Sequence, residues 1–226
     1  LVQPSVYGTD NTVLLAALRE AGPAIRGVAV VEWTVDGPAI AALHAAGVRG
    51  VRVNVVDVRE GRGELPVARL RGLAERIAPY GWHLELLAHV DQYPSLDHEL
   101  AEFPVDLVFG HLGYMRTDRG RADPGFQALV RLLEGERAWA KLTGPYRIST
   151  GAMPHADVVP FARELLRAAP QRVVWGSDWP HVMVKGEMPN DGDLADLLLD
   201  WVPDEELRRK VLVDNPARLY GFPASL

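Results

Sequence analysis

The sequence contains no cysteine among its 226 residues. This absence excludes disulfide bonds, a thiolate nucleophile and zinc sites built from cysteine ligands. It suits a reducing compartment, so we expect a cytoplasmic protein. The sequence also has no apolar run long enough to cross a bilayer and no signal-peptide pattern at its start. We therefore expect no membrane partner.

A basic face is missing as well. The formal net charge is −6, and the 30 acidic residues are interspersed with the 24 basic ones. Because nucleic-acid binding needs clustered positive charge, we do not expect nucleic acid as a partner. A local group of arginines can still bind a small anion, and a small anionic substrate is the partner we expect. With no linker or low-complexity segment, residues 1–226 are predicted to form one domain.

Strand and helix patterns alternate along the chain. Strands are predicted near residues 2, 28, 48, 82, 105, 138 and 172, the second of them over residues 27–33. Helical apolar faces lie between the strands, and helices are also predicted at residues 96–103 and 204–213. This alternation predicts an α/β protein with a parallel sheet covered by helices. The spacing of about 28 residues favours a (β/α)8 TIM barrel. A doubly wound open sheet is the alternative, but the glycine-rich phosphate loop that it needs after its first strand is absent.

The start of the sequence has the pattern of a strand that is already ending. Leu1 to Gln3 form a short apolar stub before Pro4, and the first residue is not methionine. We expect an eighth strand before Leu1, so that the barrel lacks its first strand in this sequence. An incomplete barrel would expose strand edges, and a homo-oligomer is one way to cover them.

Polar residues stand where several predicted strands end, and a barrel keeps its catalytic groups at these carboxyl ends. Asp178 follows the last strand. Taken alone, an aspartate in such a loop is more often a turn or helix-cap residue than a base. Because histidine, arginine and tyrosine side chains converge on the same end from distant segments, we favour a catalytic role. The companions of Asp178 at this end are Tyr7, Arg52, Asn54, His89, His111, Tyr146, Arg147 and His181.

Alternation along residues 48–56 predicts which side chains enter the lumen. The valines on one face suit the helix layer, whereas Arg52 and Asn54 lie on the opposite, inner face. A buried arginine is costly unless an anion is near, so Arg52 indicates either a bound anion or a buried Arg–Asp pair. Arg147, after a Gly-Pro turn, either binds a carboxylate through two hydrogen bonds or is solvated.

Two motifs are the most specific in the chain: Gly176-Ser177-Asp178-Trp179-Pro180-His181 and Gly144-Pro145-Tyr146-Arg147. With the other strand-end motifs, in order along the whole chain, they resemble the amidohydrolase-2 family. The group that they resemble most is the 2-pyrone-4,6-dicarboxylate hydrolases, which are lactonases. The resemblance implies an eight-stranded barrel that hydrolyses small lactones, or decarboxylates or hydrates related acids.

The resemblance also implies residue roles. Asp178 would be the base that activates water, and His111 would polarise the substrate carbonyl. Arg52 and Arg147 would bind substrate carboxylates. Val58 stands where a second substrate arginine is expected, with Arg59 beside it. The remaining candidates are assigned to substrate binding: Tyr7, Asn54, His89, Tyr146 and His181.

A His-x-His pair, which the resemblance places at the end of the first strand, is absent from the sequence. In metal-using relatives this pair binds zinc or a similar ion, whereas the pyrone hydrolases work without metal. We therefore assign no metal ligand, and a zinc ion remains open if the pair precedes Leu1.

Three functional hypotheses follow. The leading one is hydrolysis of a small carboxylated lactone, either a 2-pyrone-dicarboxylate or a sugar-acid lactone. The second is a zinc-dependent member of the same family, either a decarboxylase or a sulfolactone or sugar-lactone hydrolase. The third is an inactive barrel that serves as a binding protein.

Overall fold

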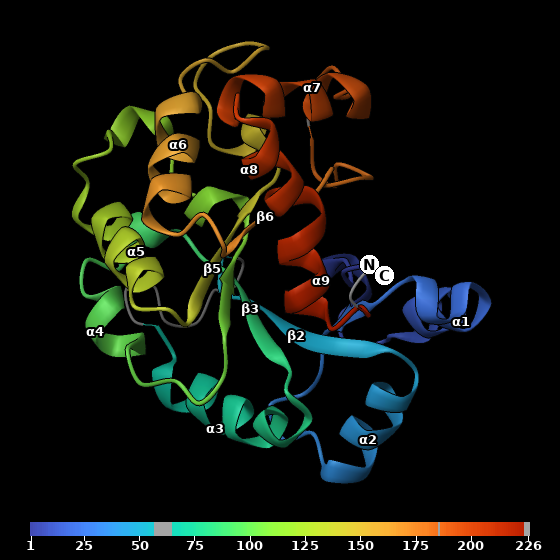
Figure 1. The fold of residues 1–226 in the computed structure, drawn as a ribbon. Helices are drawn as coiled ribbons and strands as arrows, with labels where there is room; N and C mark the ends of the chain where they lie inside the picture. Colours follow the sequence, from blue (N-terminus) through green and yellow to red (C-terminus); the bar gives the residue numbers. More distant parts are fainter. Residues whose placement is uncertain (57–64, 185, 224–226) are drawn as a thin grey trace.

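A single parallel sheet organises the fold. The computed structural model describes residues 1–56, 65–184 and 186–223. In this part of the chain the six strands pair in sequence order, each parallel to the next, and the sheet curls as part of an α/β barrel would (Figure 1). The predicted parallel sheet is confirmed. The strands are β1 (Gly27–Ala29), β2 (Val48–Asn54), β3 (His83–Leu87), β4 (Leu107–Phe109), β5 (Ala138–Leu142) and β6 (Val173–Trp175).

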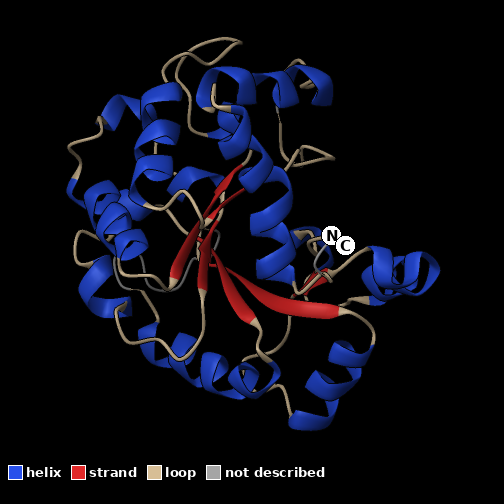
Figure 2. Ribbon diagram, in the orientation of Figure 1, coloured by secondary structure: helices blue, strands red, loops and turns tan. Residues whose placement is uncertain are grey.

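Helices connect the strands and lie mainly around the outside of the curl (Figure 2). Their first turns are fixed by acid or amide side chains at the N-cap, as at Asp36, Asp123, Asn190 and Asp204. None of the helices in the described ranges is both long and apolar enough to cross a membrane. The helices are α1 (Thr12–Ala21), α2 (Gly37–Ala45), α3 (Val67–Ile77), α4 (Leu96–Leu100), α5 (Pro124–Glu134), α6 (Val159–Ala168), α7 (Asp191–Trp201), α8 (Glu205–Arg209) and α9 (Asn215–Tyr220).

The two faces of the sheet have different partners. The outer face belongs to the main core, where strand residues such as Leu107 and Leu142 pack with the helices. The inner face is covered at one end by α9, since Leu219 packs with Val108, Trp139 and Val174 in a second cluster. The predicted alternation along β2 agrees with this division.

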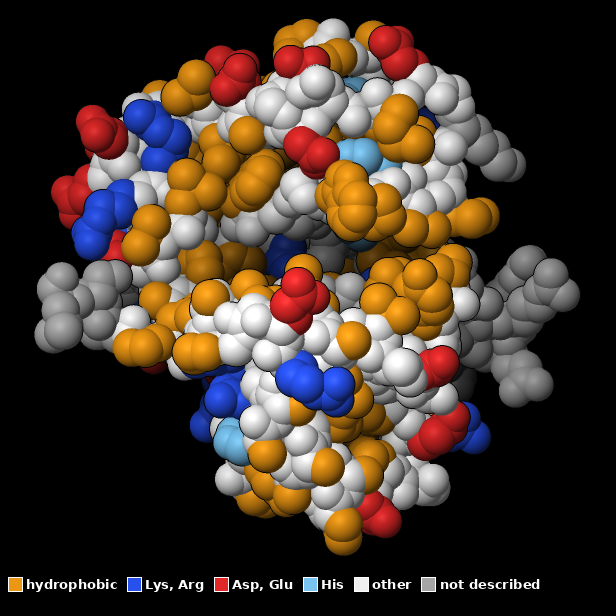
Figure 3. Space-filling model, turned by 90° about the vertical axis from the view of Figure 1, so that its right-hand side faces the viewer, with side chains coloured by type: hydrophobic (Ala, Val, Ile, Leu, Met, Phe, Trp, Pro, Cys, Tyr) orange, Lys and Arg blue, Asp and Glu red, His pale blue; other side chains and the backbone are white. Residues whose placement is uncertain are grey.

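Beyond the end that α9 covers, the inner face of the sheet is polar. Arg52 and Glu85 are register partners on β2 and β3. The Nζ atom of Lys141 lies 2.6 Å from Glu85 Oε2, and both side chains are buried. On the face drawn in Figure 3 the surface is hollowed, with a basic side chain deep in the hollow and hydrophobic side chains along its edges.

Several predicted strands are shorter in the structure than the sequence suggests. The strand predicted at residues 27–33 ends at Ala29, because the side chain of Asn11 takes both backbone groups of Val30: Nδ2 donates to its carbonyl and Oδ1 accepts from its N–H. The stub at the start forms an isolated parallel bridge between Val2 and Val28. The strand expected before Leu1 lies outside the sequence and stays a prediction.

Two helix predictions also need correction. The helix predicted at residues 96–103 ends as α4 at Leu100. The one predicted at residues 204–213 divides into α8 and a π-helical turn, Lys210–Asp214. At the start of α1, the carboxylate of Asp10 accepts the backbone N–H of Thr12 at 3.0 Å, although Asn11 occupies the N-cap position.

Candidate active site

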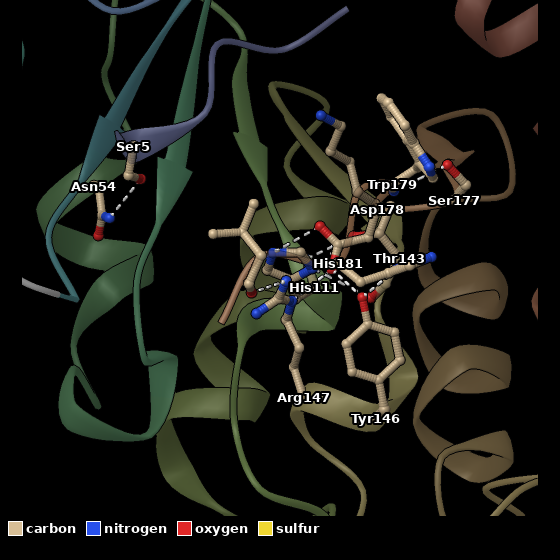
Figure 4. Close-up of polar contacts among 12 residues, drawn as sticks. Ser5, Asn54, His111, Thr143, Tyr146, Arg147, Ser177, Asp178, Trp179 and His181 are labelled. Carbon is tan, nitrogen blue, oxygen red and sulfur yellow. Dashed lines mark hydrogen bonds and ion pairs between the residues drawn. The ribbon is translucent and has the colours of Figure 1, made fainter. Parts of the chain in front are cut away.

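Asp178, on the loop after β6, is the centre of a dense set of polar contacts (Figure 4). Its backbone has a φ of 65°, in the left-handed region that is uncommon for residues other than glycine, although aspartate adopts it more readily than most. Oδ2 accepts hydrogen bonds from the Tyr146 hydroxyl at 2.6 Å and from Arg147 Nε at 2.5 Å. Oδ1 lies 3.9 Å from His111 Nε2. One carboxylate oxygen is therefore fully engaged, and the other faces the histidine.

Gly144, in the turn after β5, lets these side chains approach one another. Its φ is 54°, and a Cβ atom built on it would lie 2.8 Å from Asp178 Oδ2 and 3.0 Å from His111 Nδ1. It would also lie 3.1 Å from Cδ of Arg147. Both the backbone conformation and the space around it therefore require glycine.

His111 follows β4 and is fixed by Thr143. The Thr143 oxygen accepts the backbone N–H of His111 at 3.2 Å and lies 2.9 Å from its Nδ1. Because the Asp178 carboxylate faces Nε2 and favours a proton there, we assign the Thr143 hydroxyl as the donor to Nδ1. The remaining ring proton then sits on Nε2, which faces Asp178.

His111 is neutral at neutral pH. Burial lowers its pKa to about 4, and although Asp178 opposes the shift, the nearby cations Arg147, Arg52 and Lys141 add to it. A neutral imidazole can donate the Nε2 proton to a developing negative charge without carrying a charge of its own.

Tyr146 joins Asp178 to His181. Its hydroxyl lies 2.9 Å from His181 Nδ1, in addition to its bond to Asp178. Burial raises the pKa of Tyr146, and the hydrogen bond to Asp178 and the charge of that carboxylate raise it further, so the phenol keeps its proton. His181 is 3% exposed, and its Nε2 lies 3.2 Å from Asp191 Oδ1 at an angle outside hydrogen-bond geometry.

The other predicted residues lie around this centre or away from it. Arg52 Nη1 donates to the carbonyl of Gln3 at 3.2 Å, and Arg52 is near enough to His111 to lower its pKa. Asn54 donates to the Ser5 hydroxyl at 3.0 Å. Both side chains therefore reach the first residues of the chain.

His89 and Tyr7 do not contact the centre directly. The ring of His89 stacks on Tyr114 with centroids 4.7 Å apart, and Tyr114 in turn lies 5.2 Å from the ring of His111. Tyr7 is 49% exposed on the turn Ser5–Tyr7. The structure thus brings together Asp178, His111, Tyr146, Arg147 and His181 of the predicted set. The predicted departure at Val58 and Arg59 lies outside the described residues.

Lys141 and Glu85 form a buried ion pair that the sequence alone did not identify. Burial works against both charges, but their attraction outweighs it, so the pKa of Lys141 is raised and that of Glu85 is lowered. Arg52 also stabilises the Glu85 carboxylate. A lysine on the inner face of an otherwise apolar strand was the available signal, although nothing in the sequence pointed to its partner.

The chain resembles known proteins along nearly its whole length. A family model described as amidohydrolase matches residues 1–222. The chain belongs to the amidohydrolase family. A 4-sulfomuconolactone hydrolase of Hydrogenophaga intermedia is 37% identical, over 97% of this chain and 73% of that protein. A 2-pyrone-4,6-dicarboxylate hydrolase of Comamonas testosteroni is 36% identical, over 97% of this chain and 74% of that protein.

A solved structure extends the likeness to the fold of this amidohydrolase. It belongs to a Pseudomonas putida protein assigned as a 2-pyrone-4,6-dicarboxylic acid hydrolase. The TM-score is 0.86 at 34% identity, and the match covers 100% of this chain and 82% of that one. The family resemblance read from the motifs is confirmed.

A metal ion occurs in some proteins of this fold. A solved amidohydrolase from Burkholderia multivorans, 23% identical with a TM-score of 0.70, has zinc bound. Within residues 1–56, 65–184 and 186–223 of this amidohydrolase, no group of three or more His, Cys, Asp or Glu could hold a metal ion. Asp178 and His111 offer two ligands, but Asp178 Oδ2 already binds the guanidinium of Arg147. The described residues alone therefore do not supply enough free ligands for a metal site.

Proposed function

We propose that this amidohydrolase opens small anionic lactones, with Asp178 as the base that activates water. The proposal rests on the different contacts of the two carboxylate oxygens of Asp178. Tyr146 and Arg147 hold Oδ2, while Oδ1 stays available 3.9 Å from His111 Nε2. The lactone hydrolases to which the chain is similar support this choice of reaction.

The first chemical step joins water to the lactone carbonyl. Asp178 Oδ1 takes one proton from the water as its oxygen attacks the carbonyl carbon. His111 donates its Nε2 proton in a hydrogen bond to the oxygen that becomes negative. A positioned base contributes about 10²–10⁴-fold and one oxyanion donor about 10²–10³-fold.

Collapse of the tetrahedral intermediate completes the reaction. The bond between the carbonyl carbon and the ring oxygen breaks, and Asp178 returns its proton to that oxygen. The product is an open-chain hydroxy acid, whose new carboxyl group ionises on release. The base is then ready for another turnover.

Substrate binding is assigned chiefly to Arg52. Arg147, which was expected to bind a substrate carboxylate, already gives Nε to Asp178 and Nη2 to the carbonyl of Val182 at 3.0 Å. Its proposed role is therefore to orient the base. Among the described residues, Arg52 donates a hydrogen bond to a neutral carbonyl and shares the Glu85 carboxylate with Lys141, so part of its charge is available for a substrate anion.

The test is Asp178→Asn, assayed for opening of 2-pyrone-4,6-dicarboxylate, 4-sulfomuconolactone and a sugar-acid lactone. We expect kcat to fall at least 100-fold, because the amide keeps the shape but cannot accept a proton. Tm should fall as well, because the largely buried guanidinium of Arg147 loses its negative partner. Asp118→Asn, at an exposed position whose carboxylate pairs with Arg116 on the surface, is the matched control. Retention of kcat by Asp178→Asn would exclude this base. If the unaltered protein opens none of these lactones, the proposed reaction is wrong.

A further inference from the structure

His89, just after β3, contacts Tyr114 in a way that decides which nitrogen of its ring carries a proton. The Nδ1 atom of His89 lies 2.7 Å from the carbonyl oxygen of Tyr114. A carbonyl oxygen can only accept a hydrogen bond, so Nδ1 must be the donor. In the neutral ring the other nitrogen, Nε2, then has a lone pair and no proton. It is therefore a hydrogen-bond acceptor.

This acceptor is open to a ligand. Nε2 of His89 makes no hydrogen bond within residues 1–56, 65–184 and 186–223, and it is not buried. Both ring nitrogens of His83, at the other end of the same strand, are buried by contrast. His89 stands at the carboxyl end of β3, which is the end of the sheet where His111 follows the neighbouring strand β4.

The turn after β4 holds His89 in this arrangement. Three of its residues other than glycine, His111, Leu112 and Tyr114, have φ values of 49°, 54° and 52°, in the uncommon left-handed region. The turn places the Tyr114 ring 4.7 Å from the ring of His89 and 5.2 Å from that of His111, between centroids. Because one tyrosine ring contacts both histidines, a small molecule bound at His111 can also reach His89.

The cations at this end of the sheet favour one substrate carboxylate. Lys141 and Arg147 are already paired with carboxylates, whereas Arg52 has part of its charge left for an anion. A second substrate carboxylate beside His89 would meet the lone pair of Nε2 rather than a cation. An acceptor next to an acceptor is unfavourable in a site that is partly shielded from water. Nε2 instead suits a group that donates a hydrogen bond.

We propose that Nε2 of His89 accepts a hydrogen bond from a hydroxyl group of the substrate, which is a sugar-acid lactone with one carboxylate. Arg52 binds that carboxylate, and the lactone carbonyl lies at His111. A 2-pyrone-4,6-dicarboxylate carries no hydroxyl group, so it offers Nε2 no donor. The inference rests on the proposed lactone opening and narrows its substrate class. His89 determines specificity and takes no part in the proton transfers.

The first test compares two substrates. D-glucaro-1,4-lactone has one carboxylate and several hydroxyl groups, whereas 2-pyrone-4,6-dicarboxylate has two carboxylates and no hydroxyl group. We expect kcat/KM to be at least about tenfold higher for the hydroxylated lactone, because a site built to hydrogen-bond a hydroxyl group discriminates against an analogue that lacks it. An equal or a higher kcat/KM for the pyrone would overturn the inference.

The second test is His89→Phe, which keeps a flat ring against Tyr114 and removes the acceptor. We expect kcat/KM to fall at least about tenfold for D-glucaro-1,4-lactone and to stay within about twofold for the pyrone. His89→Gln, whose amide oxygen can accept in place of Nε2, should lose less activity on the hydroxylated lactone. His98→Phe, at an exposed position on α4, is the matched control and should change neither value. An equal fall for both lactones in His89→Phe would indicate a structural role and contradict the proposal.

Nitrogen NMR of the histidine rings tests the same acceptor without turnover. At about pH 8, where imidazole rings are mostly neutral, His89 should have a protonated Nδ1 and a bare Nε2. D-glucaro-1,4-lactone added to Asp178→Asn should shift the Nε2 signal, and the pyrone should not. A bare Nδ1, or an Nε2 signal that D-glucaro-1,4-lactone leaves unchanged, would overturn the inference. If the original protein opens no lactone, the proposed function fails, while the NMR measurement still decides the role of His89.

Discussion

A substitution at Gly144 tests whether activity depends on the close approach of the Asp178 carboxylate to the turn after β5. In Gly144→Ala the new methyl group would lie 2.8 Å from Asp178 Oδ2, so the carboxylate has to retreat about 0.6 Å to reach an ordinary contact near 3.4 Å. Because a misplacement of about 1 Å can cost 100-fold in rate, we expect kcat to fall at least tenfold. The left-handed backbone adds about 1–2 kcal/mol of strain.

Gly81 is the matched control for this substitution. It has a φ of 65°, also in the left-handed region, but a Cβ atom there would meet nothing within 4 Å. Gly81→Ala should therefore carry the same backbone strain without disturbing any side chain. For a chain of this size about 1–2 kcal/mol corresponds to a fall in Tm of roughly 2–8 °C.

Both variants should lower Tm, measured by calorimetry, and Gly144→Ala by the larger amount because of its added contacts, while only Gly144→Ala loses activity on lactones. The reasoning would be refuted if Gly144→Ala kept its full kcat. It would also be refuted if Gly81→Ala lost activity as strongly, since strain alone would then explain the effect.

Two other predictions concern charge. Arg52→Met should raise KM for an anionic lactone at least tenfold and leave KM for a neutral lactone nearly unchanged. Arg116→Met, at an exposed position, is the control. An equal rise in KM for both substrates would show that Arg52 does not bind the anion. Burial lowers the pKa of His83 and of His111 to about 4, below the 6.5 of an unfolded chain. Because these histidines bind protons more readily when unfolded, the stability that they contribute is complete above pH 6.5 and is lost as the pH falls toward 4. Calorimetry should find Tm falling across this window, and a constant Tm would contradict the assigned pKa shifts.

Much of the framework could be predicted because it depends on local pattern. The order of strands and helices follows from hydrophobic periodicity, and the alternation on β2 placed Arg52 correctly on the inner face. The common end of parallel strands was enough to expect that Asp178 and His111 lie near each other. Their roles stay predictions until the substitutions are made.

What the sequence did not predict depends on contacts between distant segments. The end of β1 is decided by the side chain of Asn11, which nothing in the strand itself encodes. Lys141 and Glu85 are 56 residues apart, so their pairing appears only when β3 and β5 lie in one sheet. Asp191 stands in an ordinary helix start, and its contact with His181 has no sequence signal.

The balance of buried charge supports the proposed role of Arg52 in binding an anionic substrate. Along the inner face and the loops above it, Lys141 pairs with Glu85, and Arg147 pairs with Asp178. Arg52 has no such partner of its own within the described residues, since it shares Glu85 with Lys141 and hydrogen-bonds a neutral carbonyl. Among the described residues, three buried or partly buried cations therefore share two carboxylates, and an unbalanced buried charge is costly. A bound anion would restore neutrality there, so the same excess positive charge that costs stability favours the proposed binding of an anionic substrate.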